Sequence, residues 1–272
     1  MMQPRAKKYF GQNFLVDQGM QEKIVRLANL KGHETVVEIG PGTGALTKHL
    51  LKLAGRVVAY EIDKDLIPNL EENYQSQGLI LIEDDILKRD IDADLKTIDP
   101  KINEVIVVAN LPYYITTPIL FRLLEQSTLV HTIVVMVQHE VGMRLCAPVK
   151  TKDYNALSVA VQYRSHAHYA FKVPKTVFKP IPGVDSAMVV LSIKPVRALD
   201  ADEEALFFDV IKQSFAQRRK TLTNNLTQKY PLEKKAFEPF FESRELPYDV
   251  RAEAMSVDDF VALTRFIQEN WR

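Results

Sequence analysis

Residues 104–114 read EVIVVANLPYY, and this stretch decides the fold. Residues 105–109 are an unbroken apolar run of mostly β-branched side chains, which is typical of a central strand covered by helices on both faces. Pro112 ends the strand because it has no backbone N–H. The residues just before it offer acceptors, the Asn110 side-chain oxygen and the Leu111 carbonyl. Open α/β sheets bind ligands at the carboxyl ends of their strands, so we expect a site here.

Tyr113 follows the two acceptors and adds a flat aromatic surface. A planar ring that carries an amino group, such as adenine, has two N–H donors for these acceptors and a face for stacking. Taken alone, the same residues also describe an ordinary strand that is stopped by a proline and an asparagine turn. The rest of the chain decides between the two interpretations.

A nucleotide-binding arrangement lies upstream, where an expected strand over residues 35–40 runs into Gly40-Pro-Gly-Thr-Gly44 and a helix follows. Gly40 and Gly42 let the backbone approach a ligand closely. The spacing G-x-G-x-G is one residue shorter than the dinucleotide pattern, so the turn does not demand a pyrophosphate. The next strand, residues 56–60, ends at Glu61, where a carboxylate can accept from both ribose hydroxyls. We expect Asp63 to cap the helix that follows.

A third strand over residues 79–82 ends in Glu83-Asp-Asp-Ile86. Asp85 is the better ligand candidate, since its carboxylate can accept from an adenine amine while Ile86 packs against the ring. Asp84 fits a simple turn equally well.

The remaining pattern completes the sheet and then changes period. Residues 132–137 predict a fifth buried strand, and residues 166–173 and 186–193 predict a closing pair. Proline stiffens the loop between that pair, so we expect it to present Phe178 rather than bury it. From about Pro195 the spacing is purely helical, which marks a second, smaller domain.

We therefore expect an α/β, Rossmann-like domain over residues 1–195, with a mostly parallel sheet and a closing antiparallel strand. An all-α domain over residues 196–272 should follow it. Hydrophobic residues at 46% and charged residues at 26% are globular values. No apolar run approaches the ~20 residues of a membrane span, and the N-terminus has no signal-peptide core.

Cys146 is the single cysteine, which excludes an internal disulfide or a cysteine zinc site and fits a reducing, cytoplasmic location. The histidines have no i,i+4 pairing, so we expect no metal. The net charge is zero, but residues 60–104 hold thirteen acidic and five basic side chains, and three other segments are basic. One charged run is usually a solvated face, whereas three favour a phosphate-binding surface. The candidate contacts are Lys7, Lys8, Arg144, Arg218, Arg219 and Lys220, the last three in Gln217-Arg-Arg-Lys220 at the head of a helix.

Seven segments together resemble the ribosomal RNA adenine N6-dimethyltransferases, and most closely the bacterial small-subunit enzymes, in order along nearly the whole chain. They are Gln12-Asn-Phe-Leu-Val-Asp17, Glu38-Ile-Gly-Pro-Gly-Thr-Gly44, Glu61-Ile-Asp63, Asp85, Asn110-Leu-Pro-Tyr113, Val177-Phe-Lys-Pro-Ile-Pro-Gly-Val-Asp-Ser186 and Phe215-Ala-Gln-Arg-Arg-Lys-Thr-Leu222. The resemblance implies an S-adenosylmethionine-dependent methyltransferase with a helical RNA-binding domain. It would dimethylate two adjacent adenosines near the 3′ end of small-subunit (16S) RNA, on immature 30S subunits during ribosome biogenesis. We expect a monomer.

The resemblance also implies the site residues. Cofactor contacts fall on Asn13, Leu15, Gly40, Glu61, Asp85 and Asn110. For catalysis, Asn110 and Leu111 would accept both N6 hydrogens, which favours a pyramidal nitrogen and stabilises its developing positive charge. Tyr113 and Phe178 would hold a flipped base by stacking. Three residues depart from the family pattern: Tyr114 in place of a frequent Asn, His139 in place of the usual Lys, and Asn155 in place of a Gly.

Two interpretations of other classes remain at this point. A nicotinamide oxidoreductase is supported only by the glycine turn and Glu61, and the missing G-x-G-x-x-G counts against it. An RNA-binding assembly factor with a secondary or vestigial transferase site would keep the basic segments but would not need the intact Asn110 turn. Within the family, methylation of large-subunit RNA for antibiotic resistance is the near neighbour.

Overall fold

The computed structural model describes Lys7 and residues 11–271. Their contacts divide the chain into two compact units. The first contains the chain up to Gly142 together with His166–Ile193, and the second contains Met143–Ser165 together with Lys194–Arg272. The helical unit is therefore built from two separate segments of the chain.

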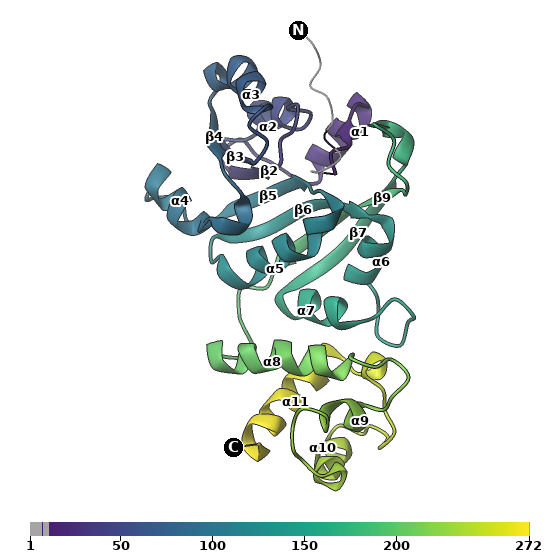
Figure 1. The fold of residues 1–272 in the computed structure, drawn as a ribbon. Helices are drawn as coiled ribbons and strands as arrows, with labels where there is room; N and C mark the ends of the chain where they lie inside the picture. The colour runs from purple at the N-terminus through teal and green to yellow at the C-terminus, as the bar shows by residue number, and fades with distance from the viewer. Residues whose placement is uncertain (1–6, 8–10, 272) are drawn as a thin grey trace. The chain divides into compact units, whose positions relative to one another are not determined.

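A seven-stranded sheet forms the centre of the first unit, in the order β4-β3-β2-β5-β6-β9-β7 (Figure 1). Its strands are β2 (Thr35–Ile39), β3 (Arg56–Glu61), β4 (Leu79–Glu83), β5 (Val105–Asn110), β6 (Val130–Gln138), β7 (Ser165–Val173) and β9 (Ser186–Ile193). The first five pair in parallel, and β9 pairs antiparallel with β6. The predicted Rossmann-like class, with a mostly parallel sheet, is confirmed.

Strand order places a ligand site at one edge of this sheet. The chain runs outward from β2 through β3 to β4, and then returns to the other side of β2 as β5. The helices that follow β2 and β5 therefore leave in opposite directions, and a crevice opens between the strand ends. Register pairs Ile39 with both Tyr60 and Ala109, so the strands end together at Gly40, Glu61 and Asn110.

Helices cover both faces of the sheet because its strands are apolar on both sides. The helices of this unit are α1 (Gln18–Arg26), α2 (Thr47–Leu53), α3 (Ile67–Tyr74), α4 (Ile91–Ile98), α5 (Thr116–Gln126) and the start of α6 (His139–Leu145). The boundary between the two units falls inside α6, between Gly142 and Met143. Ile106 and Val108 of β5 belong to the core beneath α1, α2 and α3, whereas Val107 between them points to the opposite face, where Figure 1 shows α5. Fully burying one such side chain stabilises the fold by about 1.5–3 kcal/mol.

The first turns of α1 and α3 differ in whether an aspartate side chain caps the helix. Asp17 caps α1, since its Oδ1 accepts from the Met20 N–H at 2.7 Å. The predicted cap at Asp63 is wrong. Helix α3 begins at Ile67 without a side-chain cap, and the Asp63 carboxylate accepts from Lys7 and Gln12 instead. A distant part of the chain has taken the acceptor that a local cap would use.

A small second sheet ties the start of the described chain to the proline-rich loop. Strand β1 (Phe14–Leu15) pairs antiparallel with β8 (Phe178–Lys179), which sets Leu15 opposite Phe178. The expectation that this loop presents Phe178 is wrong, because the side chain is only 1% exposed and belongs to the core of the unit. Proline stiffness restricts the loop backbone, but pairing with β1 decides which way the ring points.

The second unit has a separate aromatic core. It contains α7 (Ala156–Arg164), α8 (Ala201–Ser214), α9 (Leu222–Leu226), α10 (Glu238–Ser243) and α11 (Val257–Asn270). Tyr163 of α7 and Phe207 of α8 pack with ring centroids 4.3 Å apart, and Phe260 of α11 is fully buried in the same core. The predicted helical region after residue 195 is confirmed, and α7 from the earlier segment completes its core.

Candidate active site

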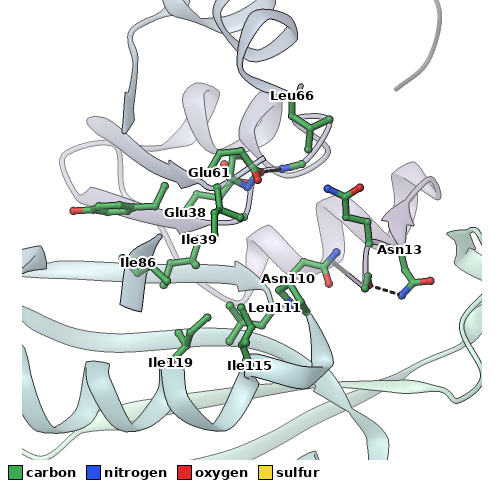
Figure 2. A pocket seen from close by; sticks show the side chains of 18 of the residues that line it. Asn13, Glu38, Ile39, Glu61, Leu66, Ile86, Asn110, Leu111, Ile115 and Ile119 are labelled. Carbon is green, nitrogen blue, oxygen red and sulfur yellow. Dashed lines mark hydrogen bonds between the residues drawn. The ribbon is translucent and has the colours of Figure 1, made fainter. Parts of the chain in front are cut away.

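A cavity of ≈ 280 Å³ opens where β2, β3, β4 and β5 end. Figure 2 shows Glu61 of β3 and Asn110 of β5 on the walls of this one pocket, with Asn13 across from them. Every predicted catalytic or cofactor residue lines it, namely Asn13, Leu15, Gly40, Gly42, Glu61, Asp85, Asn110, Leu111, Tyr113 and Phe178. The fold thus gathers residues from six separate segments into one site.

The glycine turn forms one wall with its backbone. Gly40, Gly42 and Gly44 all have positive φ, between 60° and 83°. This conformation turns the Gly42 N–H toward the Glu61 carboxylate, and its N donates to Oε2 at 3.0 Å. A Cβ at Gly44 would lie 2.2 Å from the Tyr74 ring, so only glycine fits there.

Glu61 is held in place before any ligand arrives. Its side chain is buried, with Oε2 accepting from Gly42 N and Oε1 accepting from Asp63 N at 2.9 Å. Each oxygen has a second lone pair, so the carboxylate can still accept from two hydroxyls of a ribose. Burial raises the pKa of Glu61 above its ordinary value, against the two backbone hydrogen bonds.

Glu38 is a pocket residue that the sequence interpretation did not select. It ends no strand, yet it lines the cavity at 2% exposure, and Thr47 Oγ1 donates to its Oε2 at 2.7 Å. Burial, together with the nearby Glu61 charge, raises the pKa of Glu38 to about 8, although the Thr47 hydrogen bond lowers it. The available signal was an acidic residue two positions before a glycine turn, inside an otherwise apolar strand.

Replacing Glu38 by Gln should make the protein more stable at high pH. The folded-state pKa of about 8 lies above the ordinary 4.5, so the folded protein keeps a proton that the unfolded chain releases. The stability from this group is present below pH 4.5 and is lost as the pH rises through 8. We expect the free energy of unfolding in urea to be ~1–3 kcal/mol higher for Glu38→Gln at pH 8, and the difference to shrink near pH 5. Gln keeps the oxygen that accepts from Thr47, so a difference that stays constant with pH would contradict the assignment.

The acceptor turn after β5 has the predicted form. Within the described residues, neither the Asn110 side-chain amide nor the Leu111 carbonyl makes a hydrogen bond to protein. The next carbonyl, of Pro112, is used by the turn itself, because it accepts from Ile115 N and Thr116 Oγ1, both at 3.2 Å. The turn is therefore held by the Pro112 carbonyl, and the two preceding acceptors, which belong to residues that line the cavity, need no partner within the turn.

Tyr113 stands beside these acceptors with a fixed ring. Its hydroxyl and Ser186 Oγ form a hydrogen bond of 2.7 Å, and Ser186 is fully buried. Burial raises the pKa of the Tyr113 phenol, so the group stays protonated in the neutral range. Ser186 was known only as part of a motif, and the structure gives it the role of orienting Tyr113.

Asp85 and Ile86 complete the pocket at the end of β4. One Asp85 oxygen accepts from Leu87 N at 3.0 Å and so caps a short 3₁₀ helix, Ile86–Lys88. The other oxygen makes no hydrogen bond within the described part of the chain. Ile86 is buried against the cavity, which gives a ring at this position an apolar surface beside a carboxylate.

The residues predicted to contact RNA phosphates differ in their exposure and in the partners they already have. Lys8 lies outside the described residues, and Lys7 contacts Asp63 and Asp65, both at 2.6 Å. Arg144 is half-buried in the last turn of α6. The basic segment Gln217–Lys220 lies in the turn before α9 rather than inside a helix, and all of its side chains are exposed. Arg218 Nη2 donates to the Lys152 carbonyl at 2.8 Å, which braces this turn.

The described residues contain neither a metal-binding cluster nor a membrane-spanning helix. No group of histidine, cysteine, aspartate and glutamate in that part of the chain could hold a metal ion. Among the same residues, no helix combines the length and the apolar character needed to cross a bilayer.

Comparison with known proteins shows which family the sequence matches. A family model described as ribosomal RNA adenine dimethylase matches residues 3–269. A ribosomal RNA small subunit methyltransferase A of Bacillus cereus (strain B4264) is 43% identical over 262 residues, which cover 95% of this chain and 90% of the relative. A protein of the same name from Bacillus anthracis (strain CDC 684 / NRRL 3495) matches equally well.

Solved structures show the same fold. A dimethyladenosine transferase from Plasmodium falciparum superposes with a TM-score of 0.76 at 25% identity, over 95% of this chain and 98% of that one. The 23S rRNA methyltransferase ErmE superposes with a TM-score of 0.71 at 24% identity, over 94% of this chain and 100% of that one. Both similarities extend through the helical unit.

Proposed function

Because the chain belongs to the ribosomal RNA adenine dimethylase family, we propose that it transfers methyl groups from S-adenosylmethionine to adenine N6 in ribosomal RNA. The substrate is two adjacent adenosines near the 3′ end of small-subunit RNA, and the product is N6,N6-dimethyladenosine. Support for the small subunit comes from the Bacillus relatives, whose names specify it.

One observation carries this proposal: the acceptors of the Asn110 turn line the same cavity as Gly40 and Glu61. A site that only bound a nucleotide would not need two unpaired acceptors beside an aromatic ring. A site that only bound RNA would not need a buried carboxylate at the end of β3. Their juxtaposition fits a transfer between two bound molecules.

Glu61, the glycine turn, Asp85 and Ile86 would hold the cofactor. Glu61 offers its remaining lone pairs to the ribose hydroxyls, and the glycine turn lets the backbone approach the ligand closely. Asp85 accepts from an adenine amine, while Ile86 and the exposed Ile62 provide apolar surface for the ring. When bound, S-adenosylmethionine supplies an electrophilic methyl group on a sulfonium.

Asn110 and Leu111 act on the target base. The N6 amine of adenine is a poor nucleophile because its lone pair is delocalised into the ring. When Asn110 Oδ1 and the Leu111 carbonyl accept its two hydrogens, the nitrogen becomes more pyramidal and its developing positive charge is stabilised. Two fixed acceptors perform this task without a separate general base, and the methylated nitrogen then loses its extra proton to water.

Tyr113 positions the base by stacking, since its ring is half-exposed at the pocket and anchored by Ser186. Phe178 lines the same cavity but is nearly inaccessible. We therefore propose that it contacts the edge of the bound base or cofactor as part of an apolar wall.

The basic turn before α9 is the proposed phosphate contact of the helical unit. Removing Arg219 and Lys220 together, as Arg219→Gln/Lys220→Gln, should weaken RNA binding and flatten its salt dependence by a slope of about 1 to 2. Arg218 is left intact because it braces the turn. The matched control is Lys234→Gln/Lys235→Gln, which removes the same charge from exposed residues of the same unit. Equal salt slopes for the two variants, measured by filter binding, would contradict the assignment.

We further propose that the enzyme is a cytoplasmic monomer and that it acts on immature 30S subunits. To test it, purified protein is incubated with methyl-labelled S-adenosylmethionine and either unmethylated ribosomal RNA or immature small subunits, and the label is mapped to nucleotides. We expect label as N6,N6-dimethyladenosine at two adjacent positions of small-subunit RNA. Label on large-subunit RNA would overturn the substrate, and no label on adenine would overturn the activity.

A further inference from the structure

Residues 11–15, near the start of the described chain, line the pocket and contact other residues that line it. We call Lys7 together with Gly11–Leu15 the strap. Phe14 of the strap lies against Gly42, whose added Cβ would sit 3.5 Å from that ring. Gly11 lies against Tyr114 in the same way, also at 3.5 Å, and Leu15 pairs with β8. The strap thus touches the glycine turn, the acceptor turn and the small sheet.

Asp63, two residues after the end of β3, binds two side chains of the strap. Lys7 Nζ donates to its Oδ1 at 2.6 Å, and Gln12 Nε2 donates to its Oδ2 at 2.7 Å. The Asp63 side chain is only 3% exposed, whereas the Lys7 side chain is 38% exposed, so water is kept from the carboxylate but not from the ammonium group. Burial opposes ionisation, but the hydrogen bonds from Lys7 and Gln12 outweigh it and hold the pKa of Asp63 below its usual value.

The strap contact and the cofactor site meet in this one residue. The Asp63 backbone N–H orients Glu61 by donating to Oε1, while the Asp63 side chain binds the strap. Residues 11–15 of the strap all line the cavity. Opening the strap therefore removes five of the cavity's lining residues.

We propose that Asp63 is a positioning residue that latches the strap across the bound cofactor, so that the cofactor leaves only when the Lys7 and Gln12 contacts break. The latch rests on the proposed function, because it concerns retention of S-adenosylmethionine. It also gives Lys7 a role other than phosphate binding, since two carboxylates already surround its ammonium group.

The test compares two carboxylates that contact the same lysine. Asp63 and Asp65 each lie 2.6 Å from Lys7 Nζ, but the Asp65 side chain is 71% exposed. Asp63→Asn should speed the release of radiolabelled S-adenosylmethionine, chased with unlabelled cofactor, by at least about tenfold. Asp65→Asn should change release by less than about twofold, because an exposed ion pair is weak.

Kinetics separate a latch from general damage to the fold. Asp63→Asn should raise KM for S-adenosylmethionine by about tenfold while kcat at saturating cofactor stays within about twofold of wild type. A drop in kcat with an unchanged KM would overturn the latch, as would equal release rates for wild type, Asp63→Asn and Asp65→Asn. If wild type does not bind S-adenosylmethionine at all, the proposed function fails instead.

A variant on the strap side keeps the proposal testable if Asp63→Asn folds poorly. Gln12→Leu removes the hydrogen bond to Asp63 Oδ2 and the one that Gln12 Oε1 accepts from Lys7 N at 2.8 Å, but it keeps both charged groups of the ion pair between Asp63 and Lys7. We expect cofactor release from Gln12→Leu to be faster than from wild type. In the double variant Gln12→Leu/Asp63→Asn, the two effects should be less than additive in free energy, since both break the same latch. Independent, additive effects would overturn it.

Discussion

Asn110→Ala is expected to lower kcat for methyl transfer by about 10²–10³-fold, the cost of removing one preorganised hydrogen-bonding group from a transition state. The change deletes the Oδ1 acceptor at the end of β5 and leaves the strand and the Leu111 carbonyl in place. Binding of S-adenosylmethionine, measured by calorimetry, should weaken by less than about tenfold, because Glu61 and the glycine turn remain. The loss should therefore appear in kcat rather than in cofactor affinity.

Asn110→Asp is the matched control for this prediction. It has the same shape and keeps an acceptor oxygen at the cavity, but it cannot donate. If acceptance of the N6 hydrogens is the essential step, Asp should retain clearly more activity than Ala. Wild-type turnover in Asn110→Ala, or equal activity of the Ala and Asp variants, would remove the acceptor mechanism.

Tyr113→Ala should cost about 1–3 kcal/mol of stacking free energy, measured as a fall in kcat/KM for the RNA substrate. The ring is anchored by Ser186 and lines the cavity beside Asn110, so its loss leaves a target base without a fixed plane. Cofactor affinity should stay near the wild-type value, because Tyr113 belongs to the acceptor turn.

Tyr113→Phe separates the ring from its anchor. It keeps the stacking surface and loses only the 2.7 Å hydrogen bond to Ser186 Oγ, so we expect kcat/KM to fall by less than about tenfold. A Phe variant as impaired as the Ala variant would show that the hydroxyl matters more than the aromatic face, which contradicts the stacking role.

Much of the site followed from local patterns because strand ends meet at one edge of a parallel sheet. Asn110 and Glu61 end apolar strands and Asp85 lies two residues after the end of another, so their convergence could be predicted without knowing the strand order. Glu38 was not selected as a site residue because it lies inside a strand, where an acidic side chain only interrupts the apolar run. Its position in the cavity depends on the turn that follows it.

Two wrong expectations share one cause. Asp63 stands where a helix cap is expected, but Lys7 and Gln12, about fifty residues earlier in the chain, take its carboxylate. Phe178 stands in a proline-stiffened loop, but pairing with β1 buries it. In both cases the partner comes from a distant segment, and local propensity contains no information about such a partner.

Periodicity and turn chemistry by themselves determined the layered α/β class, the acceptor turn at Asn110 and the change to a helical unit, because these depend on neighbours along the chain. The tertiary structure alone decided that the strap lines the pocket, that α7 joins the helical unit and that Ser186 anchors Tyr113. These contacts join residues that are far apart in sequence. Their energies arise only when folding excludes water from the groups that meet.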